Sequence, residues 1–253
     1  MSSTAIIEAK NLTIGYGSNV VLEDVSFDVR KGEVFVILGG SGCGKSTLLK
    51  HLIGLYPPMN GEIRIEGRDL VAAQGPDRQT ILKRIGVSYQ SGALFGSMTL
   101  AENVRLPLEE YTDLPEDALA LIAWMKLRLV GLENAGGQLP SELSGGMQKR
   151  GALARAMALD PAVVFLDEPS AGLDPVTSAG LDELILRLNE TLGMTFVIVT
   201  HELPSIYAIA DRVIMLDKEQ KGIIAEGSPE ELRDHSTNPF VHSFFHREAE
   251  ATQ

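Results

Sequence analysis

The sequence predicts an α/β protein in which helices cover a mostly parallel β-sheet. Short apolar runs recur along the chain, each of four or five residues, rich in β-branched side chains and apolar at nearly every position. A strand that is buried on both faces has this composition. Several segments between the runs have the spacing of amphipathic helices. The predicted strands are residues 34–38, 85–89, 163–166, 196–199 and 213–216.

A different pattern occupies the first 70 residues. Apolar and polar side chains alternate over residues 25–30 and again over residues 62–66. Alternation with a period of two indicates a sheet that has one solvent-facing side, which is typical of antiparallel strands. We therefore expect an N-terminal antiparallel β element that precedes and flanks the α/β core.

Between about residues 91 and 138 the strand-like runs are missing. Pro115 opens a stretch whose apolar residues, from Leu119 to Val130, have helical spacing. We interpret this region as an all-helical insertion. Its single tryptophan, Trp124, is expected to pack in a core or at an interface.

Two helix starts are well marked further along the chain. Asp174 and Pro175 precede a stripe formed by Leu181, Leu184, Ile185 and Leu188. Ser228, Pro229 and Glu231 have the order of an N-cap, a first helical residue and a capping-box partner. Beyond them lies a short apolar face that we expect to dock on the body of the protein. It consists of Phe240, Val241, Phe244 and Phe245.

Composition narrows the class of protein. The chain has 253 residues, 44% hydrophobic and 22% charged, with a net charge of −12. An acidic chain is a poor candidate for nucleic-acid binding, because Lys and Arg supply most of that affinity. One cysteine excludes an internal disulfide, and no apolar run approaches the ~18 residues of a membrane span. No secretory signal is evident, so we expect a cytosolic protein. The length fits a single domain, and we expect contact with a membrane only through a partner.

A glycine-rich loop gives the strongest local signal. Residues 39–47 match G-x-x-x-x-G-K-[ST] between a predicted strand and a predicted helix at 46–55. Its backbone N–H groups and the helix N-terminus can hold the phosphates of ATP, while Lys45 reaches the β- and γ-phosphates and the Ser46 hydroxyl ligates Mg²⁺. Cys43 is expected to be a small packed side chain, not a nucleophile. The predicted nucleotide-binding residues here are Gly39, Gly40, Ser41, Gly42, Cys43, Gly44, Lys45, Ser46 and Thr47.

Polar side chains follow two other predicted strands. Asp167 and Glu168 come directly after the strand at 163–166, and His201 closely follows the strand at 196–199. The carboxyl ends of strands are where open α/β sheets bind ligands. We expect Asp167 to hold Mg²⁺, Glu168 to polarise the attacking water, and His201 to contact the γ-phosphate. The absence of an Asn-Lys-x-Asp sequence makes a GTPase the less favoured class.

Residues 143–148, Leu-Ser-Gly-Gly-Met-Gln, resemble the LSGGQ signature of ATP-binding cassette (ABC) ATPases, with Met147 inserted before the glutamine. These residues also have the pattern of a second glycine-rich helix start, so we expect a second anion site here in addition to the phosphate loop. The resemblance implies a head-to-tail homodimer in which Ser144, Gly145 and Gly146 cover the ATP of the other copy.

Other landmarks of the ABC family follow in the expected order over residues 6–232. Tyr16 resembles the aromatic residue that stacks on adenine, and Gln90 the Q-loop glutamine that ligates Mg²⁺ and connects to the permease. Asp174 resembles the D-loop aspartate at the dimer interface, and His201 the switch histidine. Gly40 departs from the proline of many members, and we expect no loss of function from this change.

The resemblance also implies a domain organisation. The chain is similar to a P-loop NTPase (RecA-like) core that carries an N-terminal antiparallel β subdomain and an inserted α-helical subdomain. The core and β subdomain are expected at about 1–90 and 157–253, and the helical subdomain at about 91–156.

Several short segments resemble the ATPases of MCE/Mla-type lipid transporters of Gram-negative bacteria: residues 90–95, Met98, residues 103–104, residues 106–108 and residues 139–143. This implies an ATP-hydrolysing subunit at the cytoplasmic face of the inner membrane. It would drive phospholipid transport with integral-membrane permease subunits and an MCE-domain lipid-binding protein. Leu94, Phe95 and Met98 could form an apolar groove for a permease helix.

The sequence is compatible with three alternatives. The first is an ABC transporter ATPase for another substrate, and the second is a soluble ABC ATPase such as an iron–sulphur assembly factor. The third is a nucleotide-binding scaffold without useful turnover. A chromosome-type ABC protein is disfavoured, because the interval from Lys45 to Asp167 leaves no room for a coiled-coil insertion.

Overall fold

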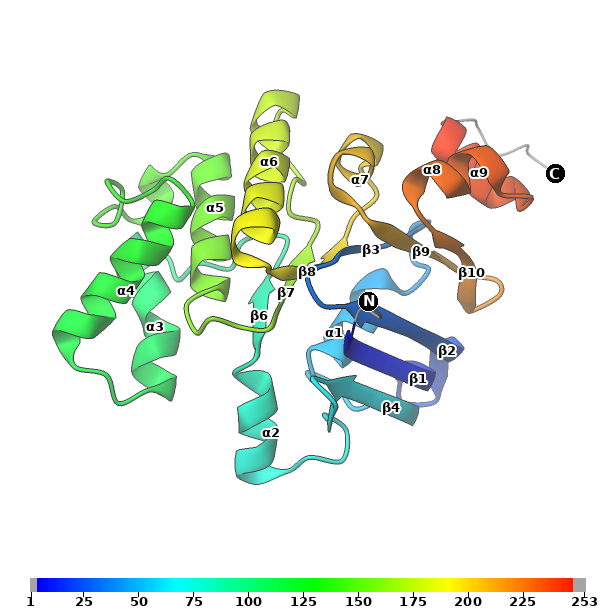
Figure 1. Cartoon of the computed structure of the whole chain (residues 1–253), viewed down its shortest axis with the longest axis horizontal. Helices are drawn as coiled ribbons and strands as arrows, with labels where there is room; N and C mark the ends of the chain where they lie inside the picture. The colour runs from blue at the N-terminus through cyan, green and yellow to red at the C-terminus, as the bar shows by residue number, and fades with distance from the viewer. Residues whose placement is uncertain (1–3, 248–253) are drawn as a thin grey trace. The chain divides into compact units, whose positions relative to one another are not determined.

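The computed structural model describes residues 4–247, which form an α/β fold divided into two compact units (Figure 1). Unit 1 comprises Met1–Ala73 and Val197–Gln253, and unit 2 comprises Gln74–Phe196. Strand β8 (Thr195–Val199) contains the point where the chain passes from unit 2 back to unit 1.

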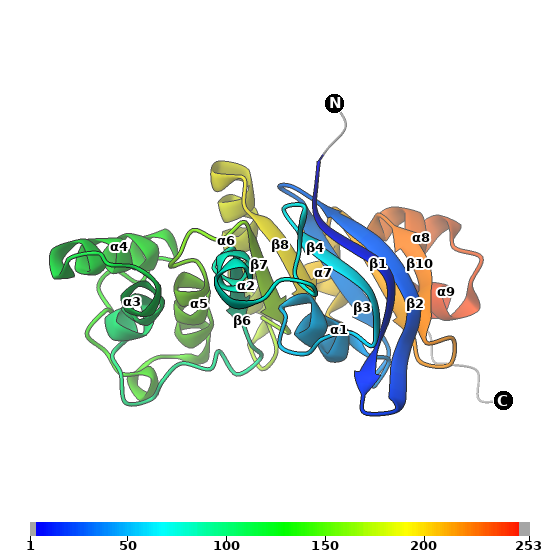
Figure 2. The same ribbon diagram turned by 90° about the horizontal axis from the view of Figure 1, so that it is seen from below.

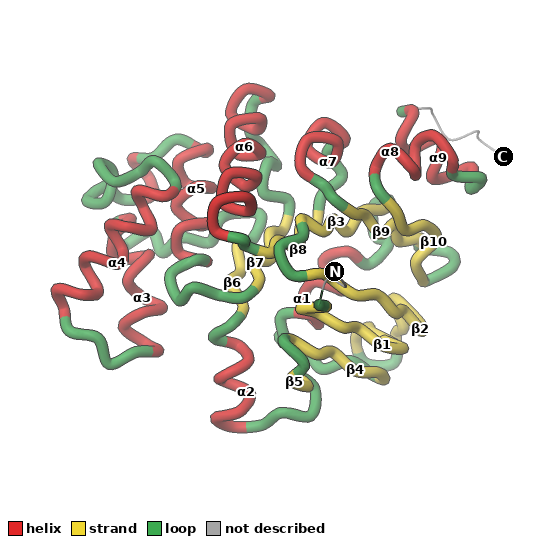
Figure 3. The backbone as a smooth tube through the Cα atoms, in the orientation of Figure 1, coloured by secondary structure: helices red, strands yellow, loops and turns green. Residues whose placement is uncertain are grey.

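An antiparallel sheet forms the N-terminal part of unit 1. Strands β1 (Ala5–Tyr16), β2 (Asn19–Arg30), β4 (Asn60–Ile65) and β5 (Arg68–Asp69) have the order β2-β1-β4-β5. The first three of these strands lie side by side in Figure 2, and β5 is labelled in Figure 3. The alternating apolar residues predicted to face inward are buried, whereas their polar neighbours are exposed or half-buried. This confirms the predicted antiparallel element with one solvent-facing side.

The second sheet of unit 1 contains the fully apolar runs. Strands β3 (Val34–Gly39), β9 (Arg212–Asp217) and β10 (Gly222–Gly227) have the order β10-β9-β3, followed by β8. Strands β3 and β9 are parallel, with Val36 opposite Val213, and every residue of β3 is buried. The continuous apolar composition therefore reflects burial on both faces. Helix α1 (Lys45–Leu52) follows β3.

Three short helices complete unit 1: α7 (Leu203–Ile209), α8 (Pro229–His235) and α9 (Pro239–His246). The predicted cap of α8 is confirmed, because the Ser228 hydroxyl accepts from Glu231 N–H while the Glu231 carboxylate accepts from Ser228 N–H. Val241 and Phe245 are buried, so α9 docks on the body of this unit as expected.

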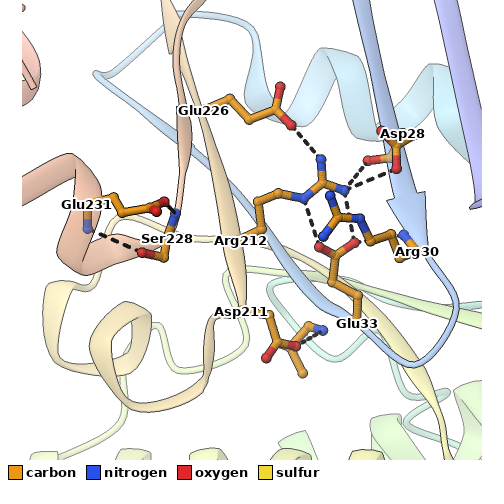
Figure 4. A network of polar contacts seen from close by, with 9 residues as sticks. Asp28, Arg30, Glu33, Asp211, Arg212, Glu226, Ser228 and Glu231 are labelled. Carbon is orange, nitrogen blue, oxygen red and sulfur yellow. Dashed lines mark hydrogen bonds and ion pairs between the residues drawn. The ribbon is translucent and has the colours of Figure 1, made fainter. Parts of the chain in front are cut away.

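An arginine ties the strands of unit 1 together (Figure 4). Arg212 Nε and Nη2 donate to the two carboxylate oxygens of Glu33 at 2.8 and 3.0 Å. Arg212 also donates to Glu226 of β10 and to the carbonyl oxygen of Asp28 in β2, and its guanidinium lies over the ring of Phe35. One side chain thus joins strands of both sheets in unit 1.

Unit 2 contains the parallel pair β6 (Ile85–Ser88) and β7 (Val163–Asp167), with Val87 opposite Phe165. Strand β8 starts here and has β7 as its neighbour. Helix α2 (Gly75–Leu82) precedes β6, and α6 (Pro175–Leu192) follows β7. The predicted apolar stripe of α6 is buried, and Asp174 is its N-cap.

The rest of unit 2 is helical (Figure 3). Helices α3 (Leu100–Tyr111), α4 (Glu116–Leu129) and α5 (Gly145–Ala156) pack on one another, and a 3₁₀ turn spans Pro140–Glu142. Residues 91–156 contain no strand, as the sequence indicated. Trp124 is not in a core, because its side chain is 43% exposed beneath the guanidinium of Arg128, and its packing at an interface stays a prediction. Across residues 4–247, no helix combines the length and apolar character of a membrane span.

Candidate nucleotide-binding site

The phosphate loop connects β3 to α1 in unit 1. Gly39 has φ 149°, and a Cβ there would lie 2.4 Å from the Leu216 carbonyl oxygen. Gly44, the N-cap of α1, has φ 109°. Only glycine adopts these positive φ angles without strain, and only glycine lacks the Cβ that would meet the Leu216 carbonyl oxygen. The spacing of the glycines therefore follows from the shape of the loop. The helix begins one residue earlier than expected and ends at Leu52, just before Gly54 at φ 73°.

Lys45 lies across this loop. Its Nζ donates to the carbonyl oxygens of Gly39 and Gly40 at 2.8 and 3.0 Å. The ammonium is therefore held beside the turn whose N–H groups and helix N-terminus favour an anion. Cys43 is buried, and burial raises the pKa of its thiol, so little reactive thiolate forms.

Tyr16 ends strand β1 and leaves 42% of its surface exposed. Tyr56 meets its ring edge-on, with centroids 5.4 Å apart, and the buried His51 ring lies 6.4 Å away. His51 Nδ1 is 2.8 Å from the Thr47 carbonyl oxygen, which can only accept, so Nδ1 is the protonated nitrogen. The exposed aromatic ring is thereby supported from α1, the helix that begins at the phosphate loop.

His201 lies two residues beyond strand β8. Thr200 N–H donates to the Ile37 carbonyl oxygen at 3.4 Å, which places this turn beside the carboxyl-terminal half of β3. The His201 side chain is 59% exposed, and its Nε2 is 3.9 Å from a Glu202 carboxylate oxygen. Unit 1 thus contains the phosphate loop, the exposed aromatic residue and the strand-end histidine.

Unit 2 contains the predicted carboxylates and the glutamine. Ser88 of β6 pairs with Leu166 of β7, so the carboxyl ends of these parallel strands meet. Gln90 and Asp167 line one open pocket of about 480 Å³, together with residues 89, 91, 171 and 172. The structure therefore brings together a carboxamide and a carboxylate oxygen, which are ligands that Mg²⁺ accepts.

Glu168 has an unusual backbone conformation. Its φ is 47°, in the left-handed region, which costs a non-glycine residue about 1–3 kcal/mol. The Glu168 carbonyl oxygen accepts from Ala171 N–H at 3.1 Å and from Lys149 Nζ at 3.4 Å. These contacts hold the residue in a turn that its intrinsic preference disfavours.

The Ser-Gly-Gly segment starts helix α5. The Ser144 hydroxyl caps the helix by accepting from Met147 N–H at 3.3 Å. A Cβ at Gly146 would lie 2.4 Å from Thr177 Cγ2, so the absence of a side chain permits close approach to the start of α6. Asp174 caps α6 at Val176 N–H and Thr177 N–H, and its hydrogen bond from the Thr177 hydroxyl lowers its pKa.

Two basic side chains of α5 that the sequence analysis missed contact the loop after β6. Lys149 Nζ donates to the Gln90 carbonyl oxygen. Arg155 donates to the carbonyl oxygens of Ala93 and Gly92 at 2.7 and 2.9 Å. The sequence marks α5 as basic, but it does not show which cations point toward this loop.

A glycine-rich phosphate loop, a buried strand that ends in two carboxylates and a second glycine-rich helix start define a P-loop ATPase of the cassette class. The model of the ABC transporter family matches residues 22–171. The chain belongs to this family.

Individual relatives agree with this assignment. The chain is 43% identical over 227 residues to the intermembrane phospholipid transport system ATP-binding protein MlaF of Haemophilus influenzae, covering 90% of this chain and 85% of the relative. It is also 43% identical over 238 residues to the probable ribonucleotide transport ATP-binding protein mkl of Mycobacterium leprae, and the match covers 94% of this chain and 68% of that relative.

The solved structures include a similar dimer. A post-hydrolysis dimeric structure of the ATP-binding cassette MJ0796, bound to ADP and Pi, matches with a TM-score of 0.78 and 30% identity, covering 88% of this chain and 98% of that one. The predicted fold class and the resemblance to Mla-type ATPases are confirmed. The chain is an ATP-binding, ATP-hydrolysing subunit of an ABC transport system.

Proposed function

We propose that this chain drives phospholipid transport through an integral-membrane permease, to which it is bound as a homodimer. The observation that carries this proposal is the 43% identity, over 90% of the chain, to a phospholipid transport ATPase. The residues that resemble lipid-transport ATPases begin at 90–95, and they add support because Phe95 among them is 52% exposed. Phe95 lies under Arg155, which also lines an open pocket of about 460 Å³ in unit 2. A permease helix can dock at this surface.

Some residues of the site bind ATP, and others act in its hydrolysis. Tyr16 stacks on adenine, and the loop from Gly39 to Thr47 surrounds the phosphates, with Lys45 as the cation. Glu168 orients the attacking water as general base, and His201 contacts the γ-phosphate. The placement of these residues at strand ends and in the phosphate loop supports the roles.

The oxygen donors of Ser46, Gln90 and Asp167 fit Mg²⁺. A hydroxyl, a carboxamide and one carboxylate are too few for a closed protein cage, and among residues 4–247 no group of three His, Cys, Asp or Glu side chains could hold a metal ion. Mg²⁺ commonly binds through one or two carboxylates plus substrate phosphates, so this donor set matches it. When bound, the ion neutralises phosphate charge.

A second copy completes each site. Ser144, Gly145 and Gly146 at the start of α5, with Asp174 of the D-loop, cover the ATP that is held by the partner. The exposed position of Ser144 and the dimeric state of the similar cassette support this arrangement. The helical subdomain, about residues 91–156, then transmits closure to the permease. The complex lies at the cytoplasmic face of the inner membrane and includes an MCE-domain lipid-binding protein.

The catalytic assignment is tested by Glu168→Gln. Loss of a general base should lower the hydrolysis rate by about 10²–10⁴-fold, while ATP binding persists because the phosphate loop is untouched. Steady-state ATPase assays and calorimetric ATP titration measure the two effects. Glu190→Gln, the same change at an exposed residue of α6, should leave both unchanged. A Glu168→Gln protein that hydrolyses ATP at the wild-type rate would show that another group is the base.

The second candidate cargo is a ribonucleotide. The M. leprae relative, a probable ribonucleotide transport ATP-binding protein, has the same 43% identity to this chain as the H. influenzae phospholipid transport ATPase. The chain should be co-purified with its membrane permease and reconstituted in proteoliposomes. ATP-dependent movement of labelled phospholipid supports the proposal, whereas movement of labelled ribonucleotide supports the alternative. Co-purification only with soluble proteins would instead favour an assembly-type ABC ATPase.

A further inference from the structure

Lys149 of helix α5 contacts two loops that contain proposed catalytic residues. Its Nζ donates to the carbonyl oxygen of Gln90, in the loop after β6, and to that of Glu168, in the loop after β7. The side chain is half-buried, and all three residues lie in unit 2. A single ammonium thus connects the signature helix to the Q-loop and to the proposed general base.

The charge environment of Lys149 agrees with this geometry. Burial lowers the pKa of Lys149, and the negative charges of Glu168 and Asp167 oppose that shift. The ammonium therefore lies in the field of both carboxylates, and it donates hydrogen bonds to the backbone carbonyl oxygens of Gln90 and Glu168. Through these two hydrogen bonds it can orient the turn.

The backbone that Lys149 contacts needs support. Glu168 has a left-handed φ of 47°, and its carbonyl oxygen accepts from Lys149 and from Ala171 N–H. Rotation of this peptide would turn the carbonyl away from the ammonium and would redirect the Glu168 side chain. Because reacting groups must be held within fractions of an ångström, such a rotation affects rate more than binding.

We propose that Lys149 is a positioning residue for ATP hydrolysis, which fixes the backbones of Glu168 and Gln90 to the signature helix. This inference rests on the proposed role of Glu168 as general base. Lys149 is five residues beyond Ser144, roughly 7–8 Å along a rigid helix at 1.5 Å per residue. A displacement of Ser144 on contact with the partner's ATP therefore moves Lys149, and with it the two loops.

The first test compares Lys149→Met, Lys149→Arg and Lys31→Met in the full-length protein. Methionine keeps an unbranched side chain but removes the donors, so kcat should fall about 10- to 100-fold while the Kd for ATP changes less than about twofold. Arginine restores donors and should recover most of the rate. Lys31, exposed between β2 and β3, is the matched control and should behave as wild type. An unchanged kcat in Lys149→Met overturns the proposal, and so does a loss that arginine does not restore.

A double-mutant comparison separates positioning from general structural damage. If Lys149 acts through Glu168, then adding Lys149→Met to Glu168→Gln should reduce the residual rate by less than about twofold. A second full 10- to 100-fold loss would overturn the proposal. Thermal unfolding checks that each variant folds, and Lys149→Leu, which also lacks N–H donors, replaces Lys149→Met where it does not. If Glu168→Gln alone hydrolyses ATP normally, the proposed base is wrong, whereas a normal Lys149→Met with an inactive Glu168→Gln refutes only this inference.

Discussion

At the scale of single residues, the support beneath Tyr16 explains how an exposed aromatic ring can be a defined binding surface. The ring leaves 42% of its area exposed, yet Tyr56 contacts its edge and His51 packs nearby. His51 is in turn fixed by the Thr47 carbonyl oxygen. The proposed adenine-stacking residue and the phosphate loop are therefore parts of one connected structure in unit 1.

Tyr16→Ala should raise the Kd for ATP by about 5- to 150-fold, because base–aromatic stacking contributes about 1–3 kcal/mol. Tyr16→Phe keeps the ring and should bind almost as wild type. Calorimetric titration with ATP measures both. Tyr111→Ala removes another exposed tyrosine, in unit 2, and should leave the Kd unchanged. Normal ATP affinity in Tyr16→Ala would mean that adenine does not stack at this position.

Some residues of the site could be predicted from the sequence and others could not. Lys45 and Glu168 are predictable because motif spacing and position after a buried strand define their chemistry. Lys149 and His51 are not, because their contacts depend on the direction in which a helical side chain points across the fold. Trp124 shows the same limit, since an apolar ring on an amphipathic helix gave no sign that Arg128 covers it at the surface.

At the scale of elements, Arg212 connects strands that lie far apart in the chain. Glu33 is only 6% exposed and has both carboxylate oxygens bonded to Arg212, while Asp28 and Glu226 add further acceptors. A bidentate pair of this kind fixes orientation as well as distance. Removal of the cation would leave a buried carboxylate without its charge partner.

Arg212→Met should therefore lower the free energy of unfolding by about 3–5 kcal/mol, the usual consequence of removing one partner of a buried pair. Arg64→Met breaks an exposed pair with Glu62 and should cost less than about 1 kcal/mol. Urea denaturation followed by circular dichroism measures both. Equal destabilisation by the two substitutions would show that burial of Glu33 does not set the cost.

Elements with continuous or alternating apolar patterns were predictable, and those without them were not. The buried strands follow from their apolar runs, and the start of α8 follows from its capping residues. Helix α2 has no distinct apolar face and only Ile81 buried, so apolar periodicity does not predict it. Strand β5 is a two-residue polar strand without an apolar pattern, and its pairing with β4 defines it.

At the scale of the whole molecule, the proposed nucleotide residues divide between the two units. The phosphate loop, Tyr16 and His201 belong to unit 1, whereas Gln90, Glu168 and the signature belong to unit 2. A single chain also carries two glycine-rich helix starts, at α1 and α5. In the proposed dimer, two copies related by a two-fold axis would use both helix starts at each ATP, which would give each of the two glycine-rich segments a phosphate to bind.

This arrangement predicts a dimer that depends on ATP. Glu168→Gln should trap the dimer with ATP, because nucleotide binds but is not hydrolysed. Adding Ser144→Arg should keep the protein monomeric, since a large cation at the start of α5 blocks approach of the second copy, while ATP still binds to the open monomer. Thr191→Arg, at the exposed end of α6, adds the same charge elsewhere and should still dimerise. Multi-angle light scattering with and without ATP gives the masses, and a Ser144→Arg protein that dimerises normally would rule out a head-to-tail interface at the signature.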